Sequence, residues 1–165
     1  MDVLFVIAAM IGVVALYFRS NPLKHSNRFM FRRFLNWFPL GMSYAFLYFA
    51  RYNLNVSANA LGDRISNSDF GIIFAAGTGV YAFSFLINGP LVDSIGGKKG
   101  IVIACIGSSI MNFAMGLLTF LALKGEIDKS KLVLYFSILY GMNMFFQSYG
   151  AVSIIKVKAY WFHVR

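Results

Sequence analysis

The feature that most constrains this chain is a series of five apolar segments, each close to the length needed to cross a bilayer. They cover residues 3–18, 34–61, 70–92, 100–123 and 132–155. A transmembrane helix needs about 20 mostly apolar residues, and such blocks differ from the one-sided stripe of a soluble helix. With 59% hydrophobic and 13% charged residues, the chain has too little polar surface for a soluble domain of 165 residues. The sequence therefore predicts an all-α integral membrane protein.

The Lys and Arg residues indicate how the chain would be oriented. If the basic stretch 19–33 is cytoplasmic, that side carries ten Lys and Arg residues and one acidic residue. The outer side then carries four Lys and Arg residues and five acidic residues. This asymmetry follows the positive-inside rule and places the N-terminus outside. Because the net charge of +9 is divided among loops, we expect no nucleic-acid surface. The prediction is a multi-pass protein of a bacterial inner (plasma) membrane.

Residues 1–31 are predicted to form a separate anchor helix and a basic cytoplasmic linker. The segment 3–18 is short for a span, and basic residues follow it instead of preceding it. A cleavable signal peptide has the reverse order, so we expect an uncleaved membrane anchor. The second predicted domain is 32–165.

Arg51 lies inside the second apolar segment, about 25 Å from its cytoplasmic end at 1.5 Å per residue. One explanation is an arginine near the outer interface that snorkels to water. The other explanation is that Arg51 belongs to a polar stripe on one helix face. The stripe has spacings of 4, 3, 4 and 4 residues and consists of Tyr44, Tyr48, Arg51, Asn55 and Asn59. Such a stripe lies on one helix face and is typical of a helix that lines a watery cavity.

Two further segments carry polar stripes at helical spacing. Their members are Tyr81, Ser84 and Asn88 on one segment, and Tyr140, Asn143, Gln147 and Gly150 on the other. Hydrogen bonds between helices would explain such residues, but three stripes with an arginine favour a cavity lining. Arginine suits an oxyanion because it stays charged and offers a fork of donors. The hypothesis is an anion-binding cavity.

The stretch GPLVDSIGGKKG, residues 89–100, resembles the cytoplasmic signature of the major facilitator superfamily, G-x-L-x-D-x-x-G-x-[KR]-[KR]. Its glycines permit a tight turn and a close approach of helices. Its aspartate can meet a helix N-terminus or a basic residue, and its lysines favour the cytoplasmic side. The motif residues are Gly89, Leu91, Asp93, Gly96, Lys98 and Lys99.

Two other stretches resemble one branch of that superfamily, the organophosphate:phosphate antiporters, which include glycerol-3-phosphate and hexose-6-phosphate transporters. FLYFARYNLNVSANAL is similar to their first core helix, and FFQSYGAVSIIKVKAYWF to their fourth. The resemblance covers about residues 32–165. It implies the N-terminal part of a major facilitator fold, with four core transmembrane helices, preceded here by the extra anchor helix.

The resemblance implies exchange of glycerol-3-phosphate or a sugar phosphate for inorganic phosphate by alternating access. In that family an arginine of the first core helix binds the substrate phosphate, and Arg51 takes this position. The expected substrate-binding residues are Arg51, Tyr44, Tyr48, Asn53, Asn55, Tyr81, Gln147 and Lys156. A place at the cytoplasmic interface fits Lys156 equally well. Tyr52 replaces a lysine common beside the arginine, which leaves the organic moiety open.

No catalytic residue, metal site or cofactor is predicted. Cys105 is the only cysteine, the two histidines are far apart, and no nucleophile–base pair stands out, so we do not expect an enzyme. Proteins of the major facilitator superfamily are built from two halves, and the resemblance covers only the first. We therefore expect either a fragment or a partner chain that supplies the missing C-terminal half. The expected partners are a phosphorylated small molecule, inorganic phosphate and the lipid bilayer. Two alternatives remain: a transporter-like sugar-phosphate sensor that signals to a membrane kinase, and a non-transporting truncated fragment.

Overall fold

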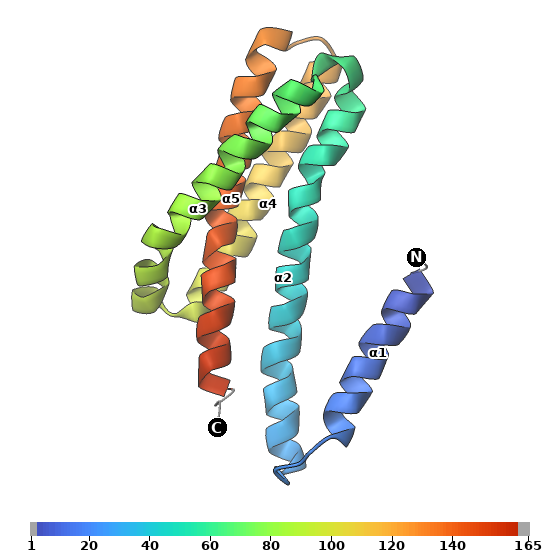
Figure 1. Cartoon of the computed structure of the whole chain (residues 1–165), viewed down its shortest axis with the longest axis vertical. Helices are drawn as coiled ribbons and strands as arrows, with labels where there is room; N and C mark the ends of the chain where they lie inside the picture. Colours follow the sequence, from blue (N-terminus) through green and yellow to red (C-terminus); the bar gives the residue numbers. More distant parts are fainter. Residues whose placement is uncertain (1–2, 162–165) are drawn as a thin grey trace. The chain divides into compact units, whose positions relative to one another are not determined.

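The computed structural model describes residues 3–161, and its regular elements within that range are all helical (Figure 1). They are α1 (Val3–Arg19), α2 (Asn27–Leu61), the short 3-10 helix η1 (Gly62–Arg64), α3 (Asn67–Ile95), α4 (Gly97–Leu123) and α5 (Lys129–Trp161). Each predicted apolar segment falls within one α-helix, which confirms the all-α prediction. The last residues of the predicted second domain, 162–165, lie outside the described range.

The chain divides into two compact units, Met1–Pro39 and Leu40–Arg165. Helix α2 contributes to both units, and Pro39 stands at the division inside it. A proline in a helix interior lacks the N–H that would bond to the carbonyl one turn earlier. The predicted boundary at 31/32 falls earlier, inside the same helix.

The smaller unit is a hairpin of α1 and the first turns of α2, held by aromatic side chains at its turn. The Tyr17 hydroxyl donates a hydrogen bond to the Met30 carbonyl at 3.0 Å. The Tyr17 ring lies 5.4 Å from the Trp37 ring, and the Phe18 ring lies 5.3 Å from the Phe34 ring, centroid to centroid. These contacts fix the end of α1 against the start of α2.

In the larger unit, α5 is the central helix and packs along both α3 and α4. The apolar core forms two clusters. The first contains Leu54, Ile73, Met115, Phe136 and Met144, among others, and the second contains Leu47, Val92, Ala104 and Tyr149. Helix α2 joins both clusters through the side chains of Leu54 and Leu47.

Gly107 of α4 allows a close approach of α5. A Cβ atom at this position would overlap the ring of Phe146. Gly116 lies on the same helix, and a Cβ atom there would meet no atom within 4 Å. The two glycines therefore separate a packing requirement from the general effect of glycine in a helix.

We expect Gly107→Ala to destabilise the protein by about 1–3 kcal/mol, because an overpacked core must shift side chains or backbone. Gly116→Ala should be neutral or stabilising by up to about 1 kcal/mol, since alanine is the better helix former. Thermal unfolding in detergent, followed by tryptophan fluorescence, checks the pair. Equal unfolding temperatures for the two variants would contradict the close packing at Gly107.

The turn between α3 and α4 explains the glycines of the facilitator-like motif. Gly96 separates the two helices with φ of 89°, a conformation that favours glycine. Gly97 and Gly100 begin α4 against α5, where Cβ atoms would overlap Val157 and Ser153. Gly89 has open space around it, so it mediates no close approach.

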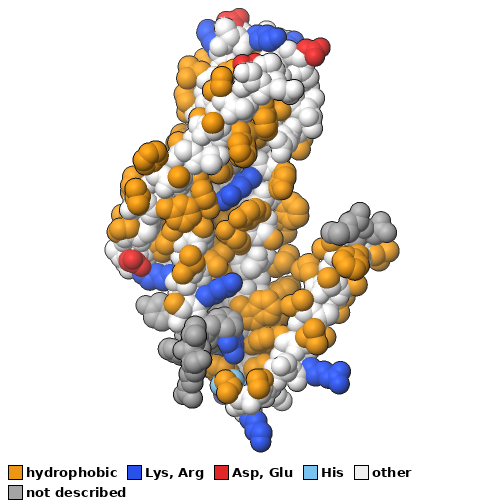
Figure 2. Space-filling view, viewed as in Figure 1, with side chains coloured by type: hydrophobic (Ala, Val, Ile, Leu, Met, Phe, Trp, Pro, Cys, Tyr) orange, Lys and Arg blue, Asp and Glu red, His pale blue; other side chains and the backbone are white. Residues whose placement is uncertain are grey.

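Among the described helices, α3 and α4 are long and apolar enough to cross a membrane. The predicted spans 34–61 and 132–155 lie in α2 and α5, whose polar side chains make them less apolar, so their crossing stays a prediction. Large hydrophobic side chains cover much of the visible face (Figure 2). Phe83, Leu86 and Phe113 are each more than 70% exposed. An apolar exterior of this extent is typical of a surface that contacts lipid or a partner.

Candidate functional site

A polar layer separates the two apolar clusters of the larger unit. On α2, Arg51 falls between Leu47 of the second cluster and Leu54 of the first. Gln147 on α5 and Ser108 on α4 fall between the same two clusters. Their side chains meet by hydrogen bonding, so the layer is continuous across three helices.

The Arg51 side chain is held by α2, α3 and α5 together. Its Nε donates to the Gln147 Oε1 at 2.6 Å. Its guanidinium carbon lies 4.5 Å from the ring centroids of Tyr48 and Tyr81. Cation–π contacts of this kind contribute about 0.5–2 kcal/mol each. The side chain thus contacts the neighbouring helices of the bundle, which is not the geometry of a snorkelling arginine.

The charge of Arg51 has no counter-ion among the described residues. Asp128 pairs with Lys131 and Asp93 pairs with Lys156, and neither ion pair includes Arg51. Within residues 3–161, Gln147 is also the one acceptor bonded to the guanidinium. A half-buried charge without a partner is unfavourable, and arginine does not lose its proton. The guanidinium is therefore suited to receive an anion.

A cavity of about 450 Å³ opens beside Arg51. Its lining comes from α2 (Tyr48, Arg51, Tyr52, Asn55), α3 (Phe74, Thr78, Tyr81) and α5 (Tyr140, Met144). The volume is within the usual range for small-molecule sites, roughly 300–1,000 Å³. Aromatic and apolar groups dominate the lining, with one permanent positive charge and a few uncharged hydrogen-bonding groups. This combination suits a small anion that carries an organic part.

Behind Arg51, a hydrogen-bond network fixes the orientation of the Gln147 amide. Gln147 Nε2 donates to Asn143 Oδ1 at 3.1 Å and to Ser108 Oγ at 3.2 Å. The same Asn143 oxygen accepts from Asn112 Nδ2 at 3.1 Å. Asn53 Nδ2 on α2 donates to Asn112 Oδ1 at 2.9 Å. Because the Gln147 amide nitrogen is engaged here, its oxygen is presented to the guanidinium.

The structure brings six of the eight predicted site residues together. Tyr48, Arg51, Asn55 and Tyr81 line the cavity. Gln147 binds Arg51 directly, and the Tyr44 hydroxyl donates to the Tyr48 hydroxyl at 3.3 Å.

Asn53 instead faces α4. It lines a second cavity of about 460 Å³, between α2 and α4, with Ser43, Cys105, Ser108 and Asn112. Its amide also belongs to the network behind Gln147. We therefore assign Asn53 a supporting place in the polar layer.

Lys156 of α5 contacts the C-terminal end of α3 and does not line the cavity. Its Nζ donates to Asp93 Oδ1 at 2.9 Å, to the Asp93 carbonyl at 2.8 Å and to the Val92 carbonyl at 3.2 Å. Asp93 thereby meets a basic residue, one of the two partners that its motif predicts. The geometry favours a place for Lys156 beside the C-terminal end of α3, and not in the substrate site.

We expect Lys156→Met to lower the free energy of unfolding by about 1–2 kcal/mol and to leave phosphate affinity unchanged. The loss comes from one half-exposed ion pair and two carbonyl hydrogen bonds at the α3 end. Denaturant titration and equilibrium phosphate binding measure the two quantities separately. A large fall in phosphate affinity with an unchanged free energy of unfolding would show that Lys156 binds the substrate.

Thr78, Tyr140 and Met144 line the cavity but are not among the expected substrate-binding residues. Tyr140 stands in a recognised polar stripe, so its spacing was a usable signal. Ser108 and Asn112 are four residues apart on an apolar span, which is the same signal on a fourth helix. Thr78 precedes Tyr81 by three residues and so continues the stripe of Tyr81, Ser84 and Asn88, a signal that was overlooked. Met144 is apolar and carried no such signal.

Comparison with known proteins adds no relative: no family model, no curated protein and no solved structure matches the chain. The resemblance to the major facilitator superfamily therefore rests on the quoted motifs and stays a prediction.

Proposed function

We propose that this protein belongs to a membrane transporter that binds a phosphorylated organic compound at Arg51 and exchanges it for inorganic phosphate. The observation that carries the proposal is the position of Arg51. It is a half-buried guanidinium beside a cavity of about 450 Å³, with no carboxylate partner among the described residues.

The chemistry around Arg51 suits a phosphate group. A guanidinium presents parallel N–H donors that match two oxygens of a tetrahedral oxyanion. Tyr48 and Tyr81 flank the cation with their rings and stabilise it without neutralising it. Asn55 and Thr78 add uncharged hydrogen-bonding groups, while Phe74 and Met144 offer apolar contact to the organic part. The motif resemblance supports the same substrate class.

The unpaired charge also gives a reason for exchange instead of one-way transport. Closing the cavity around a bare guanidinium would bury an uncompensated charge, which is costly in a low-dielectric interior. A bound phosphate compensates this charge, so only the loaded protein would reorient readily. In this mechanism the second wall of the cavity comes from a C-terminal half or from a partner chain, and the two walls rock about the bound anion.

Counterflow in proteoliposomes tests the proposal. Vesicles that contain the full protein and unlabelled phosphate should take up labelled phosphate faster than vesicles without internal phosphate. Glycerol-3-phosphate or a sugar phosphate inside should stimulate the same uptake. Uptake that does not respond to the internal anion would contradict exchange, and saturable binding without uptake would favour a sensor.

A further inference from the structure

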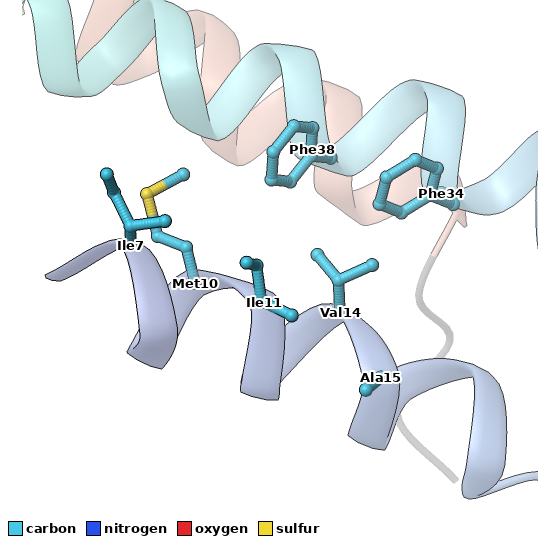
Figure 3. A pocket seen from close by; sticks show the side chains of 7 residues that line it. All are labelled: Ile7, Met10, Ile11, Val14, Ala15, Phe34 and Phe38. Carbon is cyan, nitrogen blue, oxygen red and sulfur yellow. The ribbon is translucent and has the colours of Figure 1, made fainter. Parts of the chain in front are cut away.

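The smaller unit contains an apolar groove of about 460 Å³ between α1 and the first turns of α2. Its lining residues are Ile7, Met10, Ile11, Val14 and Ala15 of α1, and Phe34 and Phe38 of α2 (Figure 3). The α1 residues share one helix face, and Ile7, Met10, Ile11 and Val14 point toward α2. Because all seven side chains are apolar, water in the groove would gain no hydrogen bonds from them, and a hydrocarbon chain is the better occupant.

A cluster of basic side chains follows the groove along the chain. We define the basic turn as Arg19, Lys24, Arg28 and Arg32, all of which are exposed. Arg19 comes one helical turn after Ala15, the last groove residue of α1. The sequence has no acidic residue between Val3 and Gly62, so nothing nearby in the chain compensates this charge.

We propose that the groove and the basic turn together bind one anionic phospholipid. An acyl chain would lie in the groove, and the phosphate headgroup would contact the basic turn. The order of side chains along α1 matches the order of groups in a lipid. Apolar residues come first, then Tyr17 and Phe18, then Arg19. Aromatic residues such as tyrosine favour the membrane interface, and basic residues near it attract anionic headgroups.

Charge complementarity decides between the lipid and other occupants. A free phosphate would use the basic turn and leave the groove empty. A helix of another chain would fill the groove but would not need uncompensated positive charge beside it. The proposal rests on the membrane location in the proposed function, but it does not depend on Arg51.

The test uses the full protein in phosphatidylcholine vesicles that contain phosphatidylglycerol with a photoreactive diazirine in one acyl chain. Mass spectrometry maps the adducts after illumination. We expect adducts within residues 7–15 and 34–38. Unlabelled phosphatidylglycerol, present during illumination, should reduce adduct formation at least tenfold more effectively than phosphatidylcholine, since each basic residue near an anionic headgroup contributes roughly fivefold.

Two kinds of variant separate the groove from the basic turn. Val14→Trp fills the groove and should remove most adducts there, whereas Val13→Trp, at an exposed position outside the lining, should not. Arg19→Gln combined with Lys24→Gln should lower the preference for phosphatidylglycerol about tenfold or more. Arg51→Lys should leave the labelling unchanged, so that failure of this inference and failure of phosphate exchange are distinguishable.

Several outcomes would overturn the inference. Equal labelling of Val14→Trp and Val13→Trp would show that the groove does not hold the acyl chain. Equal competition by the two phospholipids would reject a site for anionic lipid. Adducts spread over all exposed helices would indicate ordinary contact with bulk lipid. Crosslinks between protein chains at the groove, instead of lipid adducts, would assign the groove to a protein partner.

Discussion

Phosphate exchange should fall about a hundredfold or more when Arg51 is replaced by lysine. Lysine keeps the positive charge but lacks Nε, so it cannot donate to Gln147 and present a fork to phosphate at the same time. Hydrogen bonds to charged groups are worth about 1.5–3 kcal/mol each, and losing two of them corresponds to roughly a hundredfold. Counterflow of labelled phosphate in proteoliposomes measures the effect.

Arg64→Lys is the matched control for this substitution. Arg64 donates from Nη1 to the Ala122 carbonyl at 2.6 Å, and it does not line the cavity. The same chemical change should therefore leave exchange near the wild-type rate. Near-normal exchange by Arg51→Lys, or an equal loss in both variants, would contradict the assignment of Arg51.

Gln147→Glu should weaken phosphate binding about a hundredfold through charge alone. The Gln147 Oε1 lies 2.6 Å from Arg51 Nε, so a carboxylate there would pair with the guanidinium. The cavity would lose its uncompensated charge, and the new carboxylate would repel the anion. Buried pairs of this kind are strong enough to compete with a ligand of the same charge.

Gln147→Met provides the comparison without a charge. Both variants lack the Nε2 donor that bonds to Ser108 and Asn143, so they share this loss in the network behind Arg51. We expect a loss of only about tenfold, from one missing hydrogen bond to a charged group. Equilibrium phosphate binding to the two variants separates charge from packing. Equal affinities would show that compensation of the Arg51 charge is not what controls binding.

The helical architecture could be predicted because long apolar blocks leave few alternatives. Every predicted segment became part of one α-helix, and the structure extended the last four segments by three or more residues and the first by one residue. The capping of α3 illustrates why these ends were missed. Ser66 accepts from the Asp69 backbone while Asp69 accepts from the Ser66 backbone, a capping box that lies just before the apolar block.

Helix periodicity also predicted the centre of the site, and it explains which residues were misplaced. Tyr48 and Asn55 lie one turn from Arg51 on either side and line the same cavity. Asn53 follows Arg51 by two residues, which rotates it by about 200° toward α4. Lys156 follows Gln147 by nine residues, or roughly 14 Å along the helix axis, and so reaches the α3 end instead.

Contacts between distant segments could not be predicted in this way. The close approach of Phe146 to Gly107, and of Tyr140 to Gly77, depends on how α5 lies against α4 and α3. The pairing of Arg51 with Gln147 likewise joins residues far apart in sequence. Polar stripes predicted that each residue faces inward, but the partner of each depends on helix packing.

Titration of inorganic phosphate into the purified protein is the most direct test of the central claim, which is that Arg51 carries an uncompensated charge for an anion. Calorimetry should show one saturable site in the wild type and in Arg64→Lys. At phosphate concentrations that saturate the wild type, the same titration should show no saturation in Arg51→Lys or Gln147→Glu. Wild-type affinity in both of these variants would contradict the claim.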